Sequence, residues 1–421
     1  MKLAVLKDPT VLGVALRARQ ASHRLATLSH ECRREALLAA ANSIIKRRAE
    51  ILAANEQDIG AALRSVDEGR MSRAILRRLQ TRPRGVAEMA DDGLILHKVS
   101  CPLGVVGVVF ESRPDVIPQV AALALKSGNV LILKGGTEAA HTNEVLVSIW
   151  RDALASFYEI PIEAITLLHS REEVAELLAL DGQIDLIVPR GSREFVRYIA
   201  KHSRVPVLGH GEGICHVYVD AKADSAKAID IIVDSKTQYP AACNAAETLL
   251  IHQAVADDFL PEIITELTKQ DVEVRGCTRT VASIPQASIV RANDQDWATE
   301  YSDLIISIKV VSNLDEAIAH VNTYGSGHTE AIVTEDREAA ARFMNEVDAA
   351  SVFHNASTRF ADGFRYGFGA ELGISNGKLH ARGPVGLDGL TTYKFKLFGS
   401  GHQVAQYANG ERRFKHDASM G

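Results

Sequence analysis

From residue 103 onward, short apolar runs alternate with amphipathic helical segments, and this alternation limits the chain to a few architectures. The runs hold Val, Ile and Leu in unbroken stretches, which is typical of strands buried on both faces of a sheet. The predicted strands are 104–110, 130–134, 165–168, 184–188 and 214–219, and the predicted helices are 114–127, 137–157, 172–180 and one that opens at 191. Repeated β-α-β units form parallel sheets that commonly bind a nucleotide at the carboxyl ends of the strands. We therefore predict an α/β fold.

The glycine-rich fingerprint of a typical dinucleotide-binding sheet is missing. Gly104 and Gly107 lie inside a predicted strand, and the glycines at 209–213 lead into a strand where a helix would be needed. Another turn stands where a strand ends and a helix begins, and it could offer a cation and free amides to a phosphate. Its residues are Lys134, Gly135, Gly136 and Thr137. An ordinary glycine-rich turn explains the same pattern.

Composition narrows the class of protein. The 421 residues suffice for two or three domains, and the net charge of −6 comes from well-mixed acidic and basic residues, without a basic stripe for a nucleic-acid backbone. The five cysteines form no Cys-x-x-Cys pair, which fits a reducing compartment and argues against a disulfide framework or a structural zinc site. No apolar run reaches the roughly 18 residues of a membrane helix. We expect a cytoplasmic, soluble protein.

The two ends of the chain are expected to flank this α/β region. The first ninety or so residues are predicted to be helical, with one buried stripe that recurs every seven residues. The stripe consists of the pairs Leu37/Leu38, Ile44/Ile45 and Ile51/Leu52. Near the other end, residues 390–398 alternate with Thr391, Tyr393, Phe395 and Leu397 on one face. That pattern favours an edge strand that could pair subunits.

Cys243 is the residue to which we assign the chemistry. It lies among small residues, Ala-Ala-Cys-Asn-Ala-Ala, directly before the apolar run Thr248–Ile251. A nucleophilic sulfur needs room for a carbonyl on one side and a rigid element on the other, and this segment offers both. A buried, inert cysteine fits the segment equally well, because free cysteine is among the most buried residue types.

A polar loop with Asn355 and Arg359 follows the predicted strand 350–353. The planar fork of an arginine beside small hydroxyl residues is suited to a carboxylate or a phosphate, since it donates two parallel hydrogen bonds. A solvated surface loop is the alternative, and the residues alone do not decide between the two.

Seven motifs then occur in order along the chain, at residues 109–115, 125–129, 133–139, 239–245, 324–329, 355–360 and 379–387. They read Val-Phe-Glu-Ser-Arg-Pro-Asp, Leu-Lys-Ser-Gly-Asn, Leu-Lys-Gly-Gly-Thr-Glu-Ala, Tyr-Pro-Ala-Ala-Cys-Asn-Ala, Tyr-Gly-Ser-Gly-His-Thr, Asn-Ala-Ser-Thr-Arg-Phe and Leu-His-Ala-Arg-Gly-Pro-Val-Gly-Leu. Together they resemble the γ-glutamyl phosphate reductases, also called glutamate-5-semialdehyde dehydrogenases, of the aldehyde dehydrogenase superfamily. Residues 207–220 are especially similar to the reductase half of bifunctional pyrroline-5-carboxylate synthases, and these 421 residues hold no kinase half.

The resemblance implies an aldehyde dehydrogenase-like fold with three parts. Residues 1–236 would hold the N-terminal helices and a Rossmann-like NADP-binding domain, with 94–103 in a small β oligomerisation element. Residues 237–383 would form an α/β catalytic domain, and 384–421 would return to the oligomerisation element. The segment before residue 94 is shorter than in relatives, which leaves the assembly open, although a homo-oligomer is expected.

The resemblance also implies a reaction, the reduction of L-glutamate 5-phosphate by NADPH in the second step of proline synthesis. Cys243 would attack the acyl phosphate and hold a thioester, with Ser112 at the position of a second oxyanion donor. The other residues it implies are Lys134, Gly135, Gly136, Thr137, Gly191, Ser192 and Glu300 for the cofactor, and Arg113, Asn244, Asn355, Arg359 and Arg382 for the substrate. A neutral Thr137 beside Lys134 suits a 2′-phosphate, so NADP is favoured over NAD.

One departure concerns water. Aldehyde dehydrogenases that produce acids carry a glutamate where this chain has Gly209, and a reductase needs no base to activate water. Glu212 is a substitute base or a solvated acid. A hydrolytic aldehyde dehydrogenase and a non-catalytic partner of a kinase therefore stay as alternatives. The labile substrate further suggests transient association with a separate glutamate 5-kinase.

Overall fold

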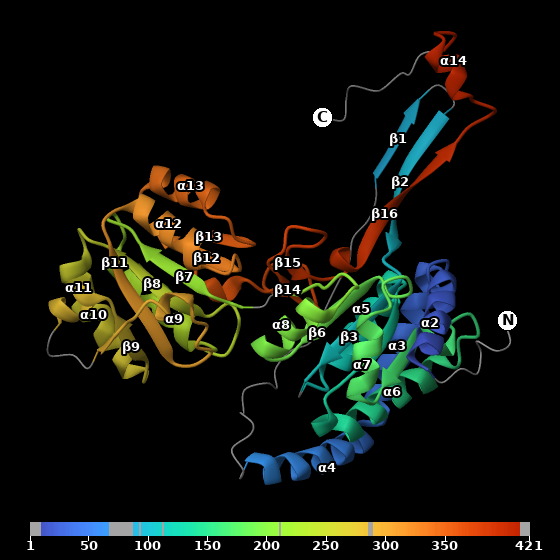
Figure 1. Cartoon of the computed structure of the whole chain (residues 1–421), viewed down its shortest axis with the longest axis horizontal. Helices are drawn as coiled ribbons and strands as arrows, with labels where there is room; N and C mark the ends of the chain where they lie inside the picture. Colours follow the sequence, from blue (N-terminus) through green and yellow to red (C-terminus); the bar gives the residue numbers. More distant parts are fainter. Residues whose placement is uncertain are drawn as a thin grey trace.

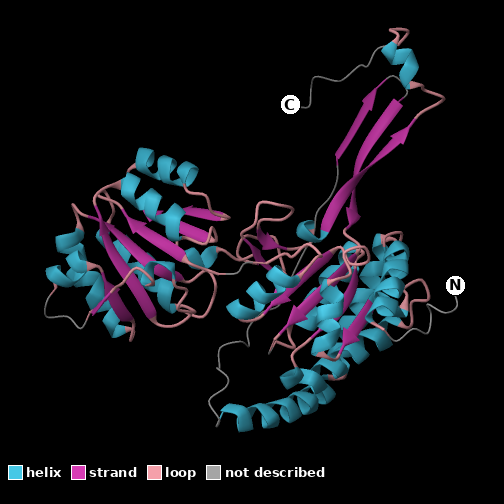
Figure 2. Ribbon diagram, viewed as in Figure 1, coloured by secondary structure: helices cyan, strands magenta, loops and turns pink. Residues whose placement is uncertain are grey.

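A computed structural model describes residues 10–66, 87–91, 94–111, 113–209, 212–284 and 289–412. The strands within these residues form a four-stranded, a seven-stranded, a three-stranded and a two-stranded sheet. Figure 1 shows the two larger sheets as separate α/β bodies, with the two-stranded sheet between them and the three-stranded sheet projecting away. Helices cover the two larger sheets, as the ribbon in Figure 2 shows. The predicted α/β fold is confirmed.

The four-stranded sheet has the order β5-β4-β3-β6, and all of its pairs are parallel. Its strands are β3 (Val105–Phe110), β4 (Val130–Lys134), β5 (Ile165–Leu168) and β6 (Leu186–Arg190). The helices that connect and flank them are α5 (Val116–Ser127), η1 (Thr137–Ala139), α6 (Ala140–Leu154), η2 (Ile162–Ala164), α7 (Arg171–Leu178) and α8 (Arg193–His202). Every residue of β3 and β4 is buried, which explains their unbroken apolar runs.

Three N-terminal helices pack on this body: α2 (Val11–Leu25), α3 (His30–Lys46) and α4 (Arg48–Val66). The buried stripe predicted there is only half right. Leu38, Ile45 and Leu52 are 52%, 71% and 49% exposed, whereas the preceding residue of each pair packs against the core. Neighbouring residues on a helix point about 100° apart, so one residue of each pair faces the core and the other faces solvent.

The seven-stranded sheet has the order β10-β9-β11-β8-β7-β12-β13, and its pairs are also parallel. Its strands are β7 (Cys215–Val219), β8 (Ala246–His252), β9 (Glu273–Gly276), β10 (Val290–Arg291), β11 (Ile305–Val311), β12 (Thr329–Val333) and β13 (Ser351–His354). Its helices are α9 (Ser225–Thr237), α10 (Ala256–Lys269), α11 (Thr278–Ser283), η3 (Asp296–Ala298), α12 (Leu314–Tyr324), α13 (Arg337–Glu346) and η4 (Thr358–Phe360).

Successive residues of its strands feed two separate cores. Val217 and Val219 face the core that includes α9 and α10, whereas Tyr218 between them faces the core with α12 and α13. Leu249 and Leu250 divide in the same way. This period of two explains why the strands are apolar throughout, since both faces of the sheet are covered by helices.

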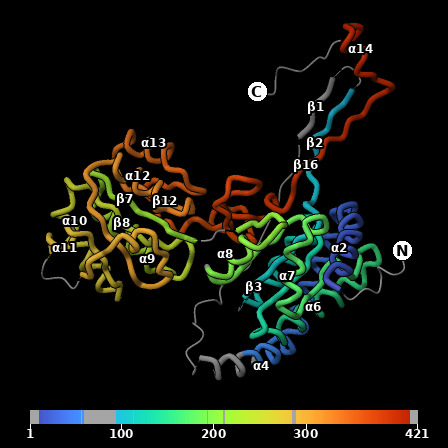
Figure 3. Tube along the Cα trace, in the orientation of Figure 1, coloured from blue at the N-terminus to red at the C-terminus, as the bar shows by residue number. Residues whose placement is uncertain are grey.

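The smaller sheets are antiparallel. β1 (Ala87–Asp91), β2 (Leu94–Pro102) and β16 (Thr391–Phe398) form one, and β14 (Gly373–Ser375) pairs with β15 (Gly383–Val385) in the other, with η5 (Asp388–Leu390) and α14 (Val404–Ala408) nearby in the chain. Figure 3 shows β2 and β16 side by side although they are far apart in the sequence. The expected edge strand is therefore β16, and all but its first residue are exposed.

The division into three domains stays a prediction. The boundary between the two parallel sheets falls earlier than residue 237, because β7 pairs with β8 and β12 of the seven-stranded sheet. Among the described helices, none combines the length and the apolar character that crossing a bilayer requires.

Candidate active site

Cys243 stands on the loop that joins α9 to β8, residues 238–245, which we call the nucleophile loop. Two turns fold it: the amide of Ala242 donates to the carbonyl of Tyr239 at 3.1 Å, and the amide of Ala245 donates to the carbonyl of Ala242 at 2.8 Å. The Cys243 side chain is half-buried, and its thiol is in no disulfide. A partly accessible thiol on a tightly turned loop meets the first requirement of a nucleophile.

Two residues, Gly213 and Cys215, contact the backbone of Cys243. A Cβ added to Gly213 would lie 2.1 Å from the Cys243 carbonyl oxygen, so only glycine fits at that position. The thiol of Cys215, which is fully buried, donates to the same carbonyl at 3.3 Å. Burial raises the pKa of Cys215 well above its ordinary value, so this thiol stays neutral and keeps its proton for the hydrogen bond.

The loop that carries Arg359 packs against the nucleophile loop through three contacts. Asn244 donates from Nδ2 to the carbonyl of Ala361 at 2.7 Å, and Arg359 donates from Nε to Gln238 at 3.0 Å. The Arg359 guanidinium also lies 5.9 Å from the ring centroid of Tyr239. Asn244 and Arg359 are nearly fully buried, and Oδ1 of Asn244 finds no hydrogen-bond partner among the described residues. The structure thus brings together two of the predicted substrate residues and the cysteine.

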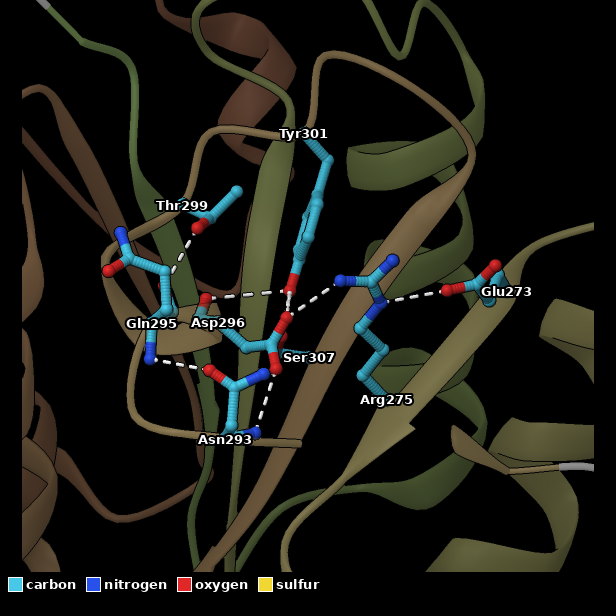
Figure 4. A network of polar contacts seen from close by, with 8 residues as sticks. All are labelled: Glu273, Arg275, Asn293, Gln295, Asp296, Thr299, Tyr301 and Ser307. Carbon is cyan, nitrogen blue, oxygen red and sulfur yellow. Dashed lines mark hydrogen bonds and ion pairs between the residues drawn. The ribbon is translucent and has the colours of Figure 1, made fainter. Parts of the chain in front are cut away.

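Glu300 lies on the segment between η3 and β11, and a network of polar contacts fixes that segment (Figure 4). The hydroxyl of Tyr301 donates to Asp296 at 2.7 Å and lies 2.7 Å from Oγ of Ser307. Arg275 donates to the same carboxylate at 2.8 Å. The position of Glu300 is therefore set by anchors on β9 and β11.

The carboxylate of Asp296 is kept ionised by its donors. Burial by itself would raise its pKa, but hydrogen bonds from the Asn293 amide, Arg275 and Tyr301 together lower the pKa below its ordinary value. The Asp296 side chain is 4% exposed, so water screens these bonds little. The network therefore keeps an ionised carboxylate in the segment that carries Glu300.

The predicted cofactor residues occupy the carboxyl ends of two strands of the four-stranded sheet. Lys134 ends β4, with Gly135, Gly136 and the exposed Thr137 directly after it, and Gly191 and Ser192 follow β6. Desolvation lowers the pKa of Lys134, whose side chain is buried, and its Nζ donates to the Gly135 carbonyl at 2.5 Å. Because these strands are parallel, their ends meet at one edge of the sheet, where nucleotides bind in such folds.

The carboxylate of Glu111 occupies the Ser192 turn, where the cofactor phosphate is expected to bind. Glu111, directly after β3, accepts the Ser192 amide at 2.9 Å, and its Oε2 lies 2.4 Å from where a Gly191 Cβ would be. A pyrophosphate at this turn would have to displace that carboxylate. The Ser192 amide is thus already paired, and the role of Lys134 and Thr137 at a nucleotide stays a prediction.

Other predicted site residues stand apart from these contacts. Ser112 lies outside the described residues. The guanidinium of Arg113 is 4.0 Å from Asp115, and its buried Nε has no hydrogen-bond partner among the described residues. Arg382 pairs with Asp348 at 3.0 Å. Within the described residues, neither Arg113 nor Arg382 forms an ion pair with the nucleophile loop, so their roles stay predictions.

Asn355 has a different environment from the one expected of a substrate residue. Its backbone is left-handed (φ 52°), and its side-chain amide both accepts from the amide of Thr334 and donates to the Thr334 carbonyl, each at 3.0 Å. These bonds pin the end of β13 to the end of β12. Asn355 thus stabilises a strand end, and its place in the substrate site stays a prediction.

Sequence reasoning missed two charged residues beside the nucleophile loop. Lys236 and Glu247 flank it, seven residues before and four residues after Cys243, and their charged atoms are 2.6 Å apart with no solvent exposure. A lysine in a last helical turn and a glutamate in a strand carry no signal of their own. Only their symmetric placement around the loop could have suggested a pair.

The chain matches known proteins over most of its length. Residues 7–301 and 287–372 match the model of the aldehyde dehydrogenase family. The chain is 51% identical to the γ-glutamyl phosphate reductase of Natronomonas pharaonis over 423 residues, covering 95% of this chain and 96% of that protein. It is 53% identical to the γ-glutamyl phosphate reductase of a Cyanothece species over 417 residues, covering 94% of each. The crystal structure of γ-glutamyl phosphate reductase from Thermotoga maritima superposes with a TM-score of 0.86 at 40% identity, covering 93% of this chain and 99% of that one.

Proposed function

Because the chain belongs to the γ-glutamyl phosphate reductase family of aldehyde dehydrogenases, an oxidoreductase family of proline biosynthesis, we propose that it reduces L-glutamate 5-phosphate to L-glutamate 5-semialdehyde with NADPH. The observation that carries the proposal is the half-buried Cys243 on a loop that is hydrogen-bonded to Arg359. A thiol nucleophile beside a buried guanidinium suits a substrate that joins a reactive acyl group to anionic groups.

The chemistry starts with the Cys243 sulfur as thiolate. It forms a bond to the γ-carbonyl carbon of the substrate, and the bond from that carbon to the phosphate oxygen breaks, so that phosphate leaves with the electron pair. A thioester stays on Cys243. When bound, NADPH supplies the hydride that reduces this acyl group to the level of an aldehyde. The sulfur to carbon bond then breaks, which releases the semialdehyde and returns the thiolate.

The residues around Cys243 contribute position and exclude a competing reaction. The two turns and the Gly213 contact fix the backbone of Cys243 and so limit where its sulfur can lie, and such positioning supplies much of the rate of reactions of this kind. Gly209 offers no carboxylate to activate water, and Glu212 is paired with Arg197 at 3.4 Å. Both features favour reduction of the thioester over its hydrolysis.

The cofactor assignment rests on the charge at the end of β4. A buried Lys134 near the exposed Thr137 supplies donors, and position 137 itself carries no carboxylate, although Glu138 follows it; this set fits a 2′-phosphate better than a free ribose hydroxyl. Residues 134–137 would hold the ribose end of the cofactor, and residues 191–192 would hold the pyrophosphate once it has displaced the Glu111 carboxylate from the Ser192 amide. Glu300 would contact the nicotinamide ribose.

Assembly and location complete the proposal. We propose a homo-oligomer formed through the β1-β2-β16 sheet, because Tyr393, Phe395 and Leu397 on β16 are 54%, 61% and 60% exposed. The cysteines of the described residues form no disulfide with one another, which fits the reducing cytoplasm. Because an acyl phosphate hydrolyses readily, transient association with a separate glutamate 5-kinase would protect the substrate.

The reverse reaction tests this function. Pyrroline-5-carboxylate, which equilibrates with the semialdehyde, is supplied with NADP, and NADPH formation is followed with and without phosphate. We expect phosphate-dependent NADPH formation in the wild type and in the control Cys101→Ser, and none in Cys243→Ala. Phosphate-independent NADPH formation would instead establish a hydrolytic dehydrogenase, and absence of activity in the wild type would favour a non-catalytic role.

A further inference from the structure

A buried ion pair closes the base of the nucleophile loop. Nζ of Lys236, in the last turn of α9, lies 2.6 Å from Oε2 of Glu247, near the start of β8, and neither side chain has any solvent exposure. Burial lowers the pKa of Lys236 and raises that of Glu247 to about 7, and each charge offsets part of this effect on the other. Two buried charges are costly to keep, since an apolar pair of similar size is often as stable or more stable.

The same glutamate reaches the segment that carries Glu300. Its second oxygen, Oε1, accepts the amide of Ser302 at 3.3 Å. Ser302 has a left-handed backbone (φ 53°), a conformation that costs free energy in a serine and persists only where neighbours enforce it. Between Glu300 and Ser302, the Tyr301 hydroxyl is hydrogen-bonded to Asp296 and Ser307, as Figure 4 shows. The two residues that follow Glu300 are thus both anchored, and the anchor of Ser302 is Glu247.

The helix end that bears Lys236 is tied to the Arg359 loop as well. Oγ of Ser235 lies 3.1 Å from Oγ of Ser357, and it accepts the amide of Thr358 at 3.2 Å. Ser235 is fully buried. The base of the nucleophile loop therefore meets both the Glu300 segment and the Arg359 loop within a few residues.

We propose that Lys236 and Glu247 are positioning residues that fix the Cys243 sulfur relative to the Glu300 segment and so couple the cofactor site to the nucleophile. The inference rests on the proposed function for the role of Glu300. A carboxylate is needed at position 247 because its two oxygens serve Lys236 and the Ser302 amide at the same time. A neutral pair could fill the space but would lose the charge-assisted bonds that define the geometry.

The test compares Lys236→Met, Glu247→Gln and the double variant. Each single variant leaves one buried charge unpaired, so its melting temperature should fall, whereas the neutral double variant should recover most of the loss. Lys269→Met with Glu266→Gln serves as the matched control, because that pair lies on α10 at 2.6 Å with side chains 60% and 39% exposed. This control should leave stability and rate close to wild type.

Two readouts separate positioning from mere stability. In the double variant we expect kcat to fall about tenfold or more and KM for NADPH to rise, since a displacement of about 1 Å can cost a hundredfold in rate. We also expect alkylation of Cys243 by iodoacetamide to change severalfold relative to the control. A double variant with wild-type stability, alkylation rate, kcat and KM would overturn the proposal.

The alkylation readout needs no substrate, so it stays informative if the proposed function fails. An unchanged kcat together with an unchanged alkylation rate would count against the positioning role and leave the proposed function intact. Absence of phosphate-dependent activity in the wild type would instead count against the proposed function. If the double variant does not unfold cooperatively, Glu247→Asp provides the comparison, because it keeps the charge and retracts the carboxylate by one methylene. Wild-type kcat and alkylation in a stable Glu247→Asp protein would then overturn the proposal.

Discussion

Gly213 lies directly against the backbone of Cys243: a Cβ there would fall 2.1 Å from the carbonyl oxygen and 2.7 Å from Cα of the cysteine. Because the obstacle is backbone, Gly213→Ala can be accommodated only if the nucleophile loop moves. We expect a loss of about 1–3 kcal/mol in the free energy of unfolding and a fall of about tenfold or more in kcat.

Denaturant unfolding and steady-state kinetics measure both effects. Gly182→Ala is the matched control, since a Cβ on Gly182 meets nothing within 4 Å. A Gly213→Ala protein with wild-type kcat would show that the loop does not depend on this contact.

Arg359 is expected to act on substrate affinity more than on the chemical step. Arg359→Lys loses the Nε bond to Gln238 and the planar fork while keeping the charge. We expect KM for the semialdehyde in the reverse reaction to rise about tenfold or more, in line with the 1.5–3 kcal/mol of a hydrogen bond to a charged group, with a smaller change in kcat. Arg342→Lys, on an exposed pair of α13, is the control. An equal loss in kcat with unchanged KM would contradict a binding role.

We expect Lys134 and Thr137 to determine the preference of the enzyme for NADPH over NADH. Thr137→Glu places a carboxylate where a 2′-phosphate would lie, and Lys134→Gln removes the cation. Both variants should lose about tenfold to a hundredfold in kcat/KM for NADPH and change little for NADH. The ratio of the two kcat/KM values measures the switch. An unchanged ratio in both variants would remove residues 134–137 from the ribose site.

The Asp296 network predicts a dependence of stability on pH. The folded carboxyl group has a pKa below its ordinary value, so its contribution is present above about pH 4 and is lost as the pH falls through the folded pKa. Asp296→Asn should lower the free energy of unfolding at pH 7 by roughly 1–3 kcal/mol, and the difference from wild type should shrink toward pH 3.

Chemical unfolding at pH 7, 5, 4 and 3 follows that difference. Asp294→Asn is the control, because Asp294 is exposed two residues away. A constant difference across this range would mean that the carboxylate charge of Asp296 does not contribute.

The exposed face of β16 should hold the proposed oligomer together. Phe395→Lys places a charge at a position that is 61% exposed in the single chain and would be buried between subunits. Light scattering after size exclusion should show a smaller species than in wild type. Tyr158→Lys, at an 87% exposed position in another part of the chain, should leave the mass unchanged. A wild-type mass for Phe395→Lys would exclude this face from the interface.

Sequence patterns predicted the elements best where local chemistry and packing agree. The run Val130–Lys134 became β4 with the predicted bounds, since Gly128 stops the preceding helix with a left-handed backbone (φ 86°) and a glycine turn follows. The strand predicted at 184–188 was observed as β6, Leu186–Arg190, because Ile184 and Asp185 belong to the turn that enters the strand. Element ends depend on tertiary hydrogen bonds that the sequence does not display.

The candidate site was predictable only in part. Cys243 and Arg359 could be singled out by residue type, and the structure joins their loops. The Lys236–Glu247 pair and the Gly213 contact could not, because they arise from how α9 and β8 meet, which no local pattern encodes. Glu111 was read only as part of a motif, although its carboxylate pairs with the Ser192 amide.

Because β2 pairs with β16, the three-stranded sheet can be completed only late in the synthesis of the chain. β2 is made early, but its partner is the segment Thr391–Phe398, so one edge of β2 waits until almost the whole described chain has left the ribosome. Until then the exposed edge of β2 can pair with a strand of another nascent chain. A ribosome that stalls after β6 and before β16 would release a chain in which all strands of the four-stranded sheet are present but the three-stranded sheet lacks β16.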